Sequence, residues 1–341
     1  DSGNKFRFDD FGTSAITLEL QEGGTYTFDQ SDSSNSGHPF RFSTTANGTH
    51  GGGSEYTVGV TTNGTAGSAG AYTRITVASG APTLYYYCAV HSGMGGQANT
   101  NTLFGSTNVK GTIQSVASAN TTSGFSIVTY TGNNTAGATV GHSLSSPPEM
   151  IWIKGRVATG ADGNWNVYAK TQGDVINETD YLLLNSNTSV TDEAGAFNDT
   201  AATSSVFSLG TFADSNGSGK TFVAYCFHSV EGFSKIGTYY VASASTDGEF
   251  ICTGFRVAWV MIKNTASGED WEIWDAGRDP VNVTTKRLKA NTNGADVTST
   301  FIDFVSNGFK LRNTSGGYNA SNKTFLYIAF AESPFKTASA R

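Results

Sequence analysis

Apolar residues in this chain recur at every second position over short runs, and no stretch longer than about two helical turns carries them at helical spacing. Such alternation is typical of β-strands that bury one face of a sheet. Between the runs lie turn-forming segments drawn from 41 glycines and many Ser, Thr and Asn residues, while Phe, Tyr and Trp make up 12% of the 341 residues and can build hydrophobic cores. The sequence therefore predicts an all-β protein, long enough for two or three domains.

The first block of the chain, residues 1–104, predicts a small β-sandwich. Its alternating runs are separated by polar, glycine-rich loops, as expected for a two-sheet domain of about 100 residues. The expected strands are 5–10, 15–20, 25–30, 39–44, 72–78 and 83–90.

An internal repeat organises the rest of the chain. GFSIVTYTGN at 124–133 returns as GFSKIGTYYV at 232–241, and MIWIK, NWNVY, LLNSN and KTFVAYCFHS have counterparts in the same order, at offsets of roughly 103 to 109. We therefore expect two tandem all-β units, sandwich or jelly-roll-like, at 123–230 and 231–341, with the repeated tryptophans packed across their central strands. Residues 105–122 lack aromatic side chains and are interpreted as a linker.

The charge and the hydropathy argue against two kinds of partner. The net charge is −7 and no basic run is present, so we expect no nucleic-acid binding. No apolar stretch approaches the roughly 18 residues that span a membrane, so we expect no membrane insertion. The chain opens on Asp1 without a signal-peptide pattern, which suggests a processed form or a fragment of something longer.

A predicted strand ends in the segment YYYCAVHSGMGG, where Cys88, His91 and Met94 follow one another at intervals of three residues. Glycines such as Gly93 let the backbone turn tightly, so a thiolate, an imidazole and a thioether can point at one place. His38, in NSGHPFRF, starts another predicted strand, and in a sandwich a strand start can lie beside a strand end. Two imidazoles, a soft thiolate and a weak thioether suit copper.

These residues carry a family resemblance. A histidine within a domain of about 100 residues, followed near its end by Cys-x2-His-x2-Met, resembles the cupredoxins, and the spacing is similar to that of the amicyanins. The resemblance covers residues 4–104, although the loops at 31–37 and 47–71 are unusually long and polar for a soluble electron carrier. It implies a β-sandwich that binds one copper ion. The implied ligands are His38, Cys88, His91 and Met94.

Each candidate residue also has an interpretation without a functional role. The alternative to a copper site is a degenerate site that keeps the fold and binds no metal. We expect His50 to be a solvated loop residue, and His142 and His228 to be structural.

Cys226 and Cys252 lie in strand-like runs and are expected to be buried free thiols or, alternatively, disulfide partners.

Few residues are suited to catalysis. Five histidines are too few for the oxygen-reducing cluster of a multicopper oxidase, and neither a nucleophile arrangement nor a phosphate-binding glycine loop is recognisable. The adjacent acids Asp192–Glu193 and Glu269–Asp270 are interpreted as solvated loop charges rather than a catalytic pair. We therefore expect a protein that is not an enzyme, with a carbohydrate-cleaving spike as the enzymatic alternative.

Nearly the whole chain is similar to structural proteins of tailed phages that infect marine bacteria, particularly cyanobacteria. Residues 23–96 resemble a cupredoxin-like module of such proteins, and the duplicated part resembles an uncharacterised domain of tail-fibre and other virion proteins. The residues that carry the second resemblance are VFSLG, DSNGSGK, FVAYCFHSVEGFSKIGTY, SNGFKLR and FAESPFK.

The phage resemblance implies a non-enzymatic virion protein, either a tail fibre or a capsid decoration, on the virion surface or otherwise extracellular. It implies contacts with other virion proteins and with itself, as a homo-oligomer with a trimer favoured, and contact with a host surface receptor or glycan. The alternative is a cell-surface or secreted copper-binding protein that transfers electrons.

Overall fold

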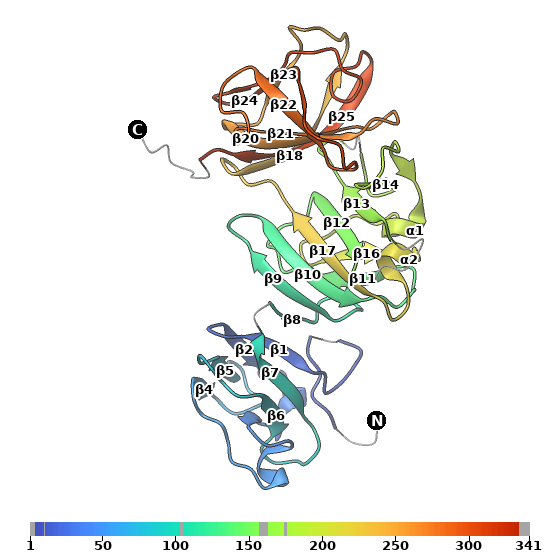
Figure 1. Ribbon diagram of the computed structural model, residues 1–341. Coiled ribbons are helices and arrows are strands. Elements are labelled where there is room, and N and C mark those ends of the chain that lie inside the picture. Colours follow the sequence, from blue (N-terminus) through green and yellow to red (C-terminus); the bar gives the residue numbers. More distant parts are fainter. Residues whose placement is uncertain (1–3, 10, 103–104, 157–162, 174–175, 334–341) are drawn as a thin grey trace. The chain divides into compact units, whose positions relative to one another are not determined.

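Strands build almost all of the regular structure, as the alternating runs predict (Figure 1). The computed structural model describes residues 4–9, 11–102, 105–156, 163–173 and 176–333. The chain divides into two compact units, Asp1–Ser118 and Ala119–Arg341. Within the described ranges, no helix is long and apolar enough to cross a membrane.

The first unit is a two-sheet β-sandwich. One sheet has the strand order β1-β7-β6-β3 and the other β2-β5-β4, and side chains from both sheets share one core. Aromatic rings fill the middle of this core, where Phe28 stacks on Phe40 and Phe40 stacks on Tyr86, with ring centroids 4.6 and 5.2 Å apart. The elements are β1 Leu18–Gln21, β2 Thr25–Asp29, η1 Ser33–Asn35, β3 Phe40–Ser43, η2 Gly48–Gly51, β4 Val60–Asn63, β5 Tyr72–Thr76, β6 Leu84–Cys88 and β7 Gly96–Thr102.

Three details of this unit differ from the sequence-based expectation. The described part of residues 5–10 forms no strand, although the Phe6 side chain is buried in the core. Strands β4 and β7 were not predicted, because VTTN and GQANTNT are polar and show no apolar alternation. Strand β7 nevertheless lies between β1 and β6, where backbone hydrogen bonds on both sides hold it.

Half of residues 105–122, the segment interpreted as a linker, forms strands, and the boundary between the two compact units falls within the same segment. Strands β8 (Ser106–Asn108) and β9 (Ser115–Asn120) form an antiparallel pair in this segment. The burial along β9 alternates, with Ser115 and Ala117 inside. Small side chains therefore occupy the positions that large apolar residues mark in other strands, and the absence of aromatics concealed the pattern.

The duplication is visible in the topology of the second unit. Strands β10, β17, β12, β13 and β14 of the first repeat follow one another in the same order as β18, β25, β20, β21 and β22 of the second, and the pair β11-β16 corresponds to β19-β24. The first repeat contains β10 Phe125–Thr131, β11 Ala138–Gly141, β12 Met150–Gly155, β13 Trp165–Ala169, β14 Asp180–Leu183, β15 Thr191–Asp192, α1 Ala194–Phe197, β16 Val206–Leu209, α2 Ala213–Asn216 and β17 Thr221–Phe227. The second contains β18 Ser234–Val241, β19 Phe250–Cys252, β20 Val257–Asn264, β21 Trp271–Asp275, β22 Thr284–Lys289, β23 Val297–Val305, β24 Gly308–Leu311 and β25 Lys323–Ala331.

Individual hydrogen bonds are also duplicated. Asn185 Oδ1 accepts a bond of 2.9 Å from the backbone N–H of Trp165, and Asn291 Oδ1 accepts one of the same length from Trp271. The repeats differ at one edge, where the nine-residue strand β23 joins β22 to β24 in the second repeat, while β14 in the first pairs only with the two-residue β15 on that side. The repeated sequence therefore specifies one strand order twice, with a local change at that edge.

The two repeats share a hydrophobic core and form one unit. Met150 and Leu182 of the first repeat pack in the same cluster as Met261, Trp271 and Leu326 of the second. The Trp271 Nε1–H group also donates a hydrogen bond of 2.9 Å to the Leu183 carbonyl oxygen. Since each repeat buries apolar surface of the other, we expect the two to unfold together.

Trp271→Ala tests this shared core. The side chain is 1% exposed, and its removal leaves a cavity and deletes the hydrogen bond to the Leu183 carbonyl oxygen, so we expect a loss of about 3–5 kcal/mol of unfolding free energy. Trp165→Ala at the equivalent, half-buried position is the matched control and should cost clearly less. All five tryptophans lie in the second unit, so their fluorescence during urea unfolding follows this unit within the intact chain. Two separate transitions in the wild type would contradict a shared core.

Equivalent buried positions carry different polar residues in the two repeats. The second residue of β13 is Asn166, and the second residue of β21 is Glu272, which is 3% exposed and lies 2.9 Å from the Arg287 guanidinium. Burial raises the pKa of Glu272 to about 7, and the attraction of Arg287 offsets this only in part. The folded chain therefore retains a proton that the unfolded chain releases near its ordinary pKa of 4.5.

This raised pKa predicts a pH-dependent stability. The contribution of Glu272 should be largest below pH 4.5 and should fall as the pH rises through about 7, by roughly 1 to 3 kcal/mol. Glu272→Gln has no such proton, so its unfolding free energy should decrease less than that of the wild type between pH 4.5 and 7.5. Tryptophan-monitored urea unfolding across this range measures the two slopes, and equal slopes would show that Glu272 does not titrate there.

Candidate metal centre

Strand pairing brings His38 beside Cys88. Strands β3 and β6 are antiparallel neighbours, and their register places Phe40 opposite Cys88. The backbone just outside the pair is also fixed, since Ala89 N–H donates a hydrogen bond of 2.9 Å to the Pro39 carbonyl oxygen. Because His38 lies two residues before Phe40, it stands at the end of β6 where Cys88 is located.

The turn after β6 brings His91 back over Cys88. The His91 backbone N–H lies 3.3 Å from Cys88 Sγ and donates to it, so the turn wraps around the sulfur. Gly95 is required in this turn, because a Cβ there would lie 1.7 Å from the carbonyl oxygen of Tyr86. The sequence thus closes the turn through a residue without a side chain, as the glycine-rich motif predicts.

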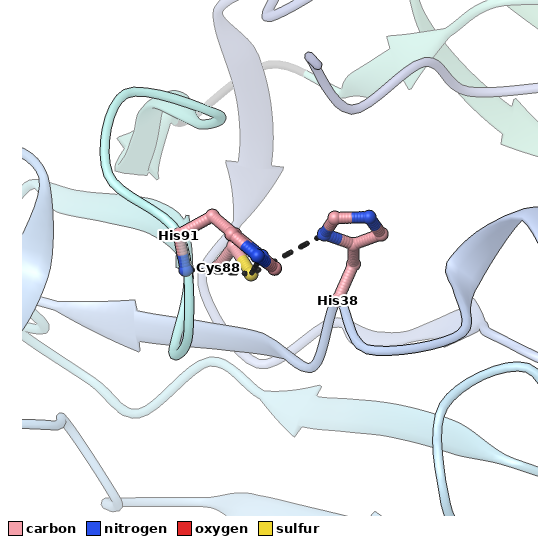
Figure 2. Close-up of side chains that lie close together, drawn as sticks. All are labelled: His38, Cys88 and His91. Atoms are coloured by element: carbon pink, nitrogen blue, oxygen red, sulfur yellow. Dashed lines mark hydrogen bonds between the residues drawn. The ribbon is translucent and has the colours of Figure 1, made fainter. Parts of the chain in front are cut away.

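The three side chains converge on one point, as Figure 2 shows. Cys88 Sγ lies 3.8 Å from His38 Nδ1 and 3.7 Å from His91 Nδ1, and all three atoms lie within 4.8 Å of one another. With metal–sulfur bonds of about 2.3 Å and metal–nitrogen bonds of about 2.0–2.1 Å, ligands at tetrahedral to trigonal angles stand about 3.5–3.8 Å apart. The spacing of the sulfur from each imidazole therefore fits a single metal ion.

Met94, the fourth predicted ligand, is buried beside a cleft that His38 also lines. The residue is 4% exposed and belongs to the core of the sandwich. It lines a cleft of about 610 Å³ together with His38, and its carbonyl oxygen accepts a hydrogen bond of 3.0 Å from Phe6 N–H. Met94 and His38 therefore line one cleft beside the cluster.

The solvent exposure of the three side chains increases from Cys88 through His38 to His91. Cys88 is fully buried, His38 is half-buried and His91 is exposed at the surface. A buried thiolate away from bulk water favours a soft metal, and imidazole nitrogens suit copper and zinc alike. The donor set can therefore hold one thiophilic ion at the edge of the core.

The structure gives His50 a contact that the sequence did not indicate. His50 is exposed, as expected for a loop residue, but its Nε2 lies 3.1 Å from the Cys88 carbonyl oxygen. Asn47 accepts a hydrogen bond of 2.7 Å from Gly93 N–H and donates one of 2.9 Å to Ser92 Oγ. No signal in the sequence could have shown these contacts, because the partners lie 38 to 46 residues apart and no local pattern links them.

The other histidines are built into the second unit. His142 is buried, accepts a bond of 3.1 Å from Leu144 N–H at Nδ1, and lies with Nε2 3.0 Å from the Thr203 carbonyl oxygen. Burial is the main reason that the pKa of His142 is lowered. His228 Nδ1 lies 3.0 Å from the carbonyl oxygen of Ser229. These contacts agree with a structural role for both residues.

The cysteines outside the cluster are free thiols in different surroundings. Cys226 is buried, and burial raises the pKa of its thiol to about 12. Cys252 is exposed on β19, so the expectation that it is buried is wrong. Burial alternates along β19, with Ile251 inside, so Cys252 lies on the outward face of its sheet. No disulfide joins the two.

One acid of each adjacent pair takes part in local structure. The Glu193 carboxylate accepts a hydrogen bond of 3.2 Å from Gly195 N–H at the start of α1. Asp270 forms an ion pair of 2.5 Å with Lys289 and accepts a bond of 2.7 Å from Asn291 Nδ2. Glu193 and Asp270 therefore each have a structural partner.

Comparison with known proteins finds one family. A family model described as a domain of unknown function (DUF7483) matches residues 98–334, which covers the duplicated part and leaves out the metal cluster. No curated protein and no solved structure matches the chain.

Proposed function

The chain belongs to the family of the domain of unknown function DUF7483, whose description names no activity, and we propose from its metal centre that it is a non-enzymatic structural protein that binds one copper ion. The observation that carries this proposal is the convergence of the thiol sulfur and two imidazole nitrogens within 4.8 Å. Cys88, His38 and His91 would hold the ion, and Met94 would supply a weak fourth ligand.

Bound copper would supply a one-electron couple and a cross-link. The chain's own residues support the cross-link, because His38 precedes β3, whereas Cys88 and His91 belong to β6 and its turn. Joining these segments restrains one end of the sandwich, and ligand binding that favours the folded state raises its stability.

The proposal extends to the setting of the protein. We suggest a virion surface, as part of a tail fibre or a capsid decoration of a phage, in contact with other virion proteins and with a host surface. The support is the resemblance of the residues to such proteins. Tandem β-units with polar, glycine-rich loops also suit a rigid exposed appendage.

An electron-transfer protein of cupredoxin type remains the second candidate. The observation that favours it is the exposure of His91, which puts one ligand of the centre at the surface. A reversible couple that reacts rapidly with a redox partner distinguishes this function from a stabilising cross-link.

Copper(II) titration of the wild type and Cys88→Ser tests the metal centre. We expect an intense thiolate-to-copper absorption band that saturates near one equivalent in the wild type and is absent in the variant. At free copper 100-fold above Kd, the wild-type first unit should gain about 2.7 kcal/mol of unfolding free energy. His142→Gln, in the second unit, is the control for unrelated histidine binding and should keep the band. A wild type without the band would refute copper binding.

The proposed virion setting predicts self-association. We expect a homo-oligomer, with a trimer favoured, because virion appendages generally assemble symmetrically. Light scattering coupled to size-exclusion chromatography measures the mass at micromolar concentration. A monomer at all concentrations would count against an appendage built from this chain alone.

A further inference from the structure

The turn formed by η2, Gly48–Gly51, and the preceding Asn47 lies against the end of β6. His50 Nε2 and the Cys88 carbonyl oxygen are 3.1 Å apart. Since a carbonyl can only accept, the imidazole nitrogen must carry the proton and donate it. Asn47 contacts the far side of the same turn, at Ser92 and Gly93, so the metal-ligand loop is held near both of its ends.

Tyr87 fixes the position of this turn. Gly48 lies directly on the Tyr87 ring, where a Cβ would come within 2.4 Å of the ring carbons. The His50 ring meets the same Tyr87 ring edge to face, with centroids 6.4 Å apart. Asn47 and Gly48 both have positive φ angles, 60° and 56°, which fold the backbone tightly over the ring. Tyr87 is 1% exposed in a central strand, so the turn rests on a rigid base.

The ligands themselves provide little of this order. The sulfur–nitrogen separations of 3.7 and 3.8 Å correspond at most to weak hydrogen bonds. His91 is exposed and lies in a turn rather than in a strand. Strand β6 fixes Cys88 at its end, and the contacts of the loop that follows must therefore determine where His91 stands relative to it.

We propose that His50 and Asn47 are positioning residues, which together clamp the Cys88–Met94 loop so that Cys88 and His91 hold their metal-binding geometry. This inference rests on the proposed copper site and adds to it two residues that are not ligands. Groups that orient metal ligands typically contribute about 10–100-fold to metal affinity.

The first test compares copper(II) affinity and the absorption spectrum among variants of the full chain. His50→Leu removes the donor, and we expect copper(II) to bind about 10–100-fold more weakly, with a shifted thiolate-to-copper band. His50→Gln keeps an N–H donor on a side chain of similar length and should restore most of the affinity and the original band. Thr49→Ala, an exposed residue of the same turn, is the matched control and should match the wild type.

The second test does not depend on copper. In protein treated with a chelator, we measure iodoacetamide alkylation of each cysteine by peptide mapping. Cys88 is 0% exposed, so its alkylation should be slow in the wild type, several-fold faster in His50→Leu, and slow again in His50→Gln. Exposed Cys252 and buried Cys226 serve as internal fast and slow references, and their rates should not change.

The outcomes separate the clamp from the metal site. Weaker copper binding and faster Cys88 alkylation in His50→Leu, both rescued by His50→Gln, support the clamp. If the wild type binds copper and His50→Leu matches it in both measurements, the clamp is overturned and the copper site stands. If the wild type shows no copper band, both the proposed copper site and the positioning role of His50 and Asn47 are refuted. Should His50→Leu fail to fold, Asn47→Ala is judged by the same two measurements.

Discussion

A β-sheet with one apolar face is stable only when a second layer covers that face, and the described chain has no helix long enough to serve as the cover. In the first unit the cover is the other sheet, since Phe40 of β3 and Ile75 of β5 lie in one core. In the second unit each repeat covers the other, with Met150 and Trp271 in a common cluster. A single repeat would leave that apolar surface in water, so the duplication itself completes the fold.

The metal centre is a consequence of this packing. The register between β3 and β6, fixed by the aromatic residues they bury, determines that a residue before β3 meets the residue that ends β6. Strand β6 also carries Tyr87, against which the η2 turn packs. From this turn His50 donates a hydrogen bond to the Cys88 carbonyl oxygen. The candidate ligands are thus positioned by the core of the first unit and by the contacts between the η2 turn and the loop after β6.

The duplicated unit shows which part of a sequence specifies topology. Strand order and hydrogen bonds such as those accepted by Asn185 and Asn291 are kept in both repeats. The burial or the identity of the side chain at an equivalent position differs where the surroundings differ. Trp271 is buried between the repeats while Trp165 is half-buried, and Glu272 carries a raised pKa where the first repeat has Asn166. The backbone pattern is repeated, and the chemistry of each copy depends on its neighbours.

The sequence by itself determined the all-β class, the duplication and the candidate ligands His38, Cys88, His91 and Met94, because alternation, repetition at a nearly constant offset and ligand spacing are properties of the chain alone. Only the tertiary structure decided that β7 and half of residues 105–122 form strands, that the repeats share a core, and that His50 contacts Cys88. These features depend on backbone pairing and on contacts between residues far apart in the chain, and a polar strand or a loop histidine carries no local mark of such partners.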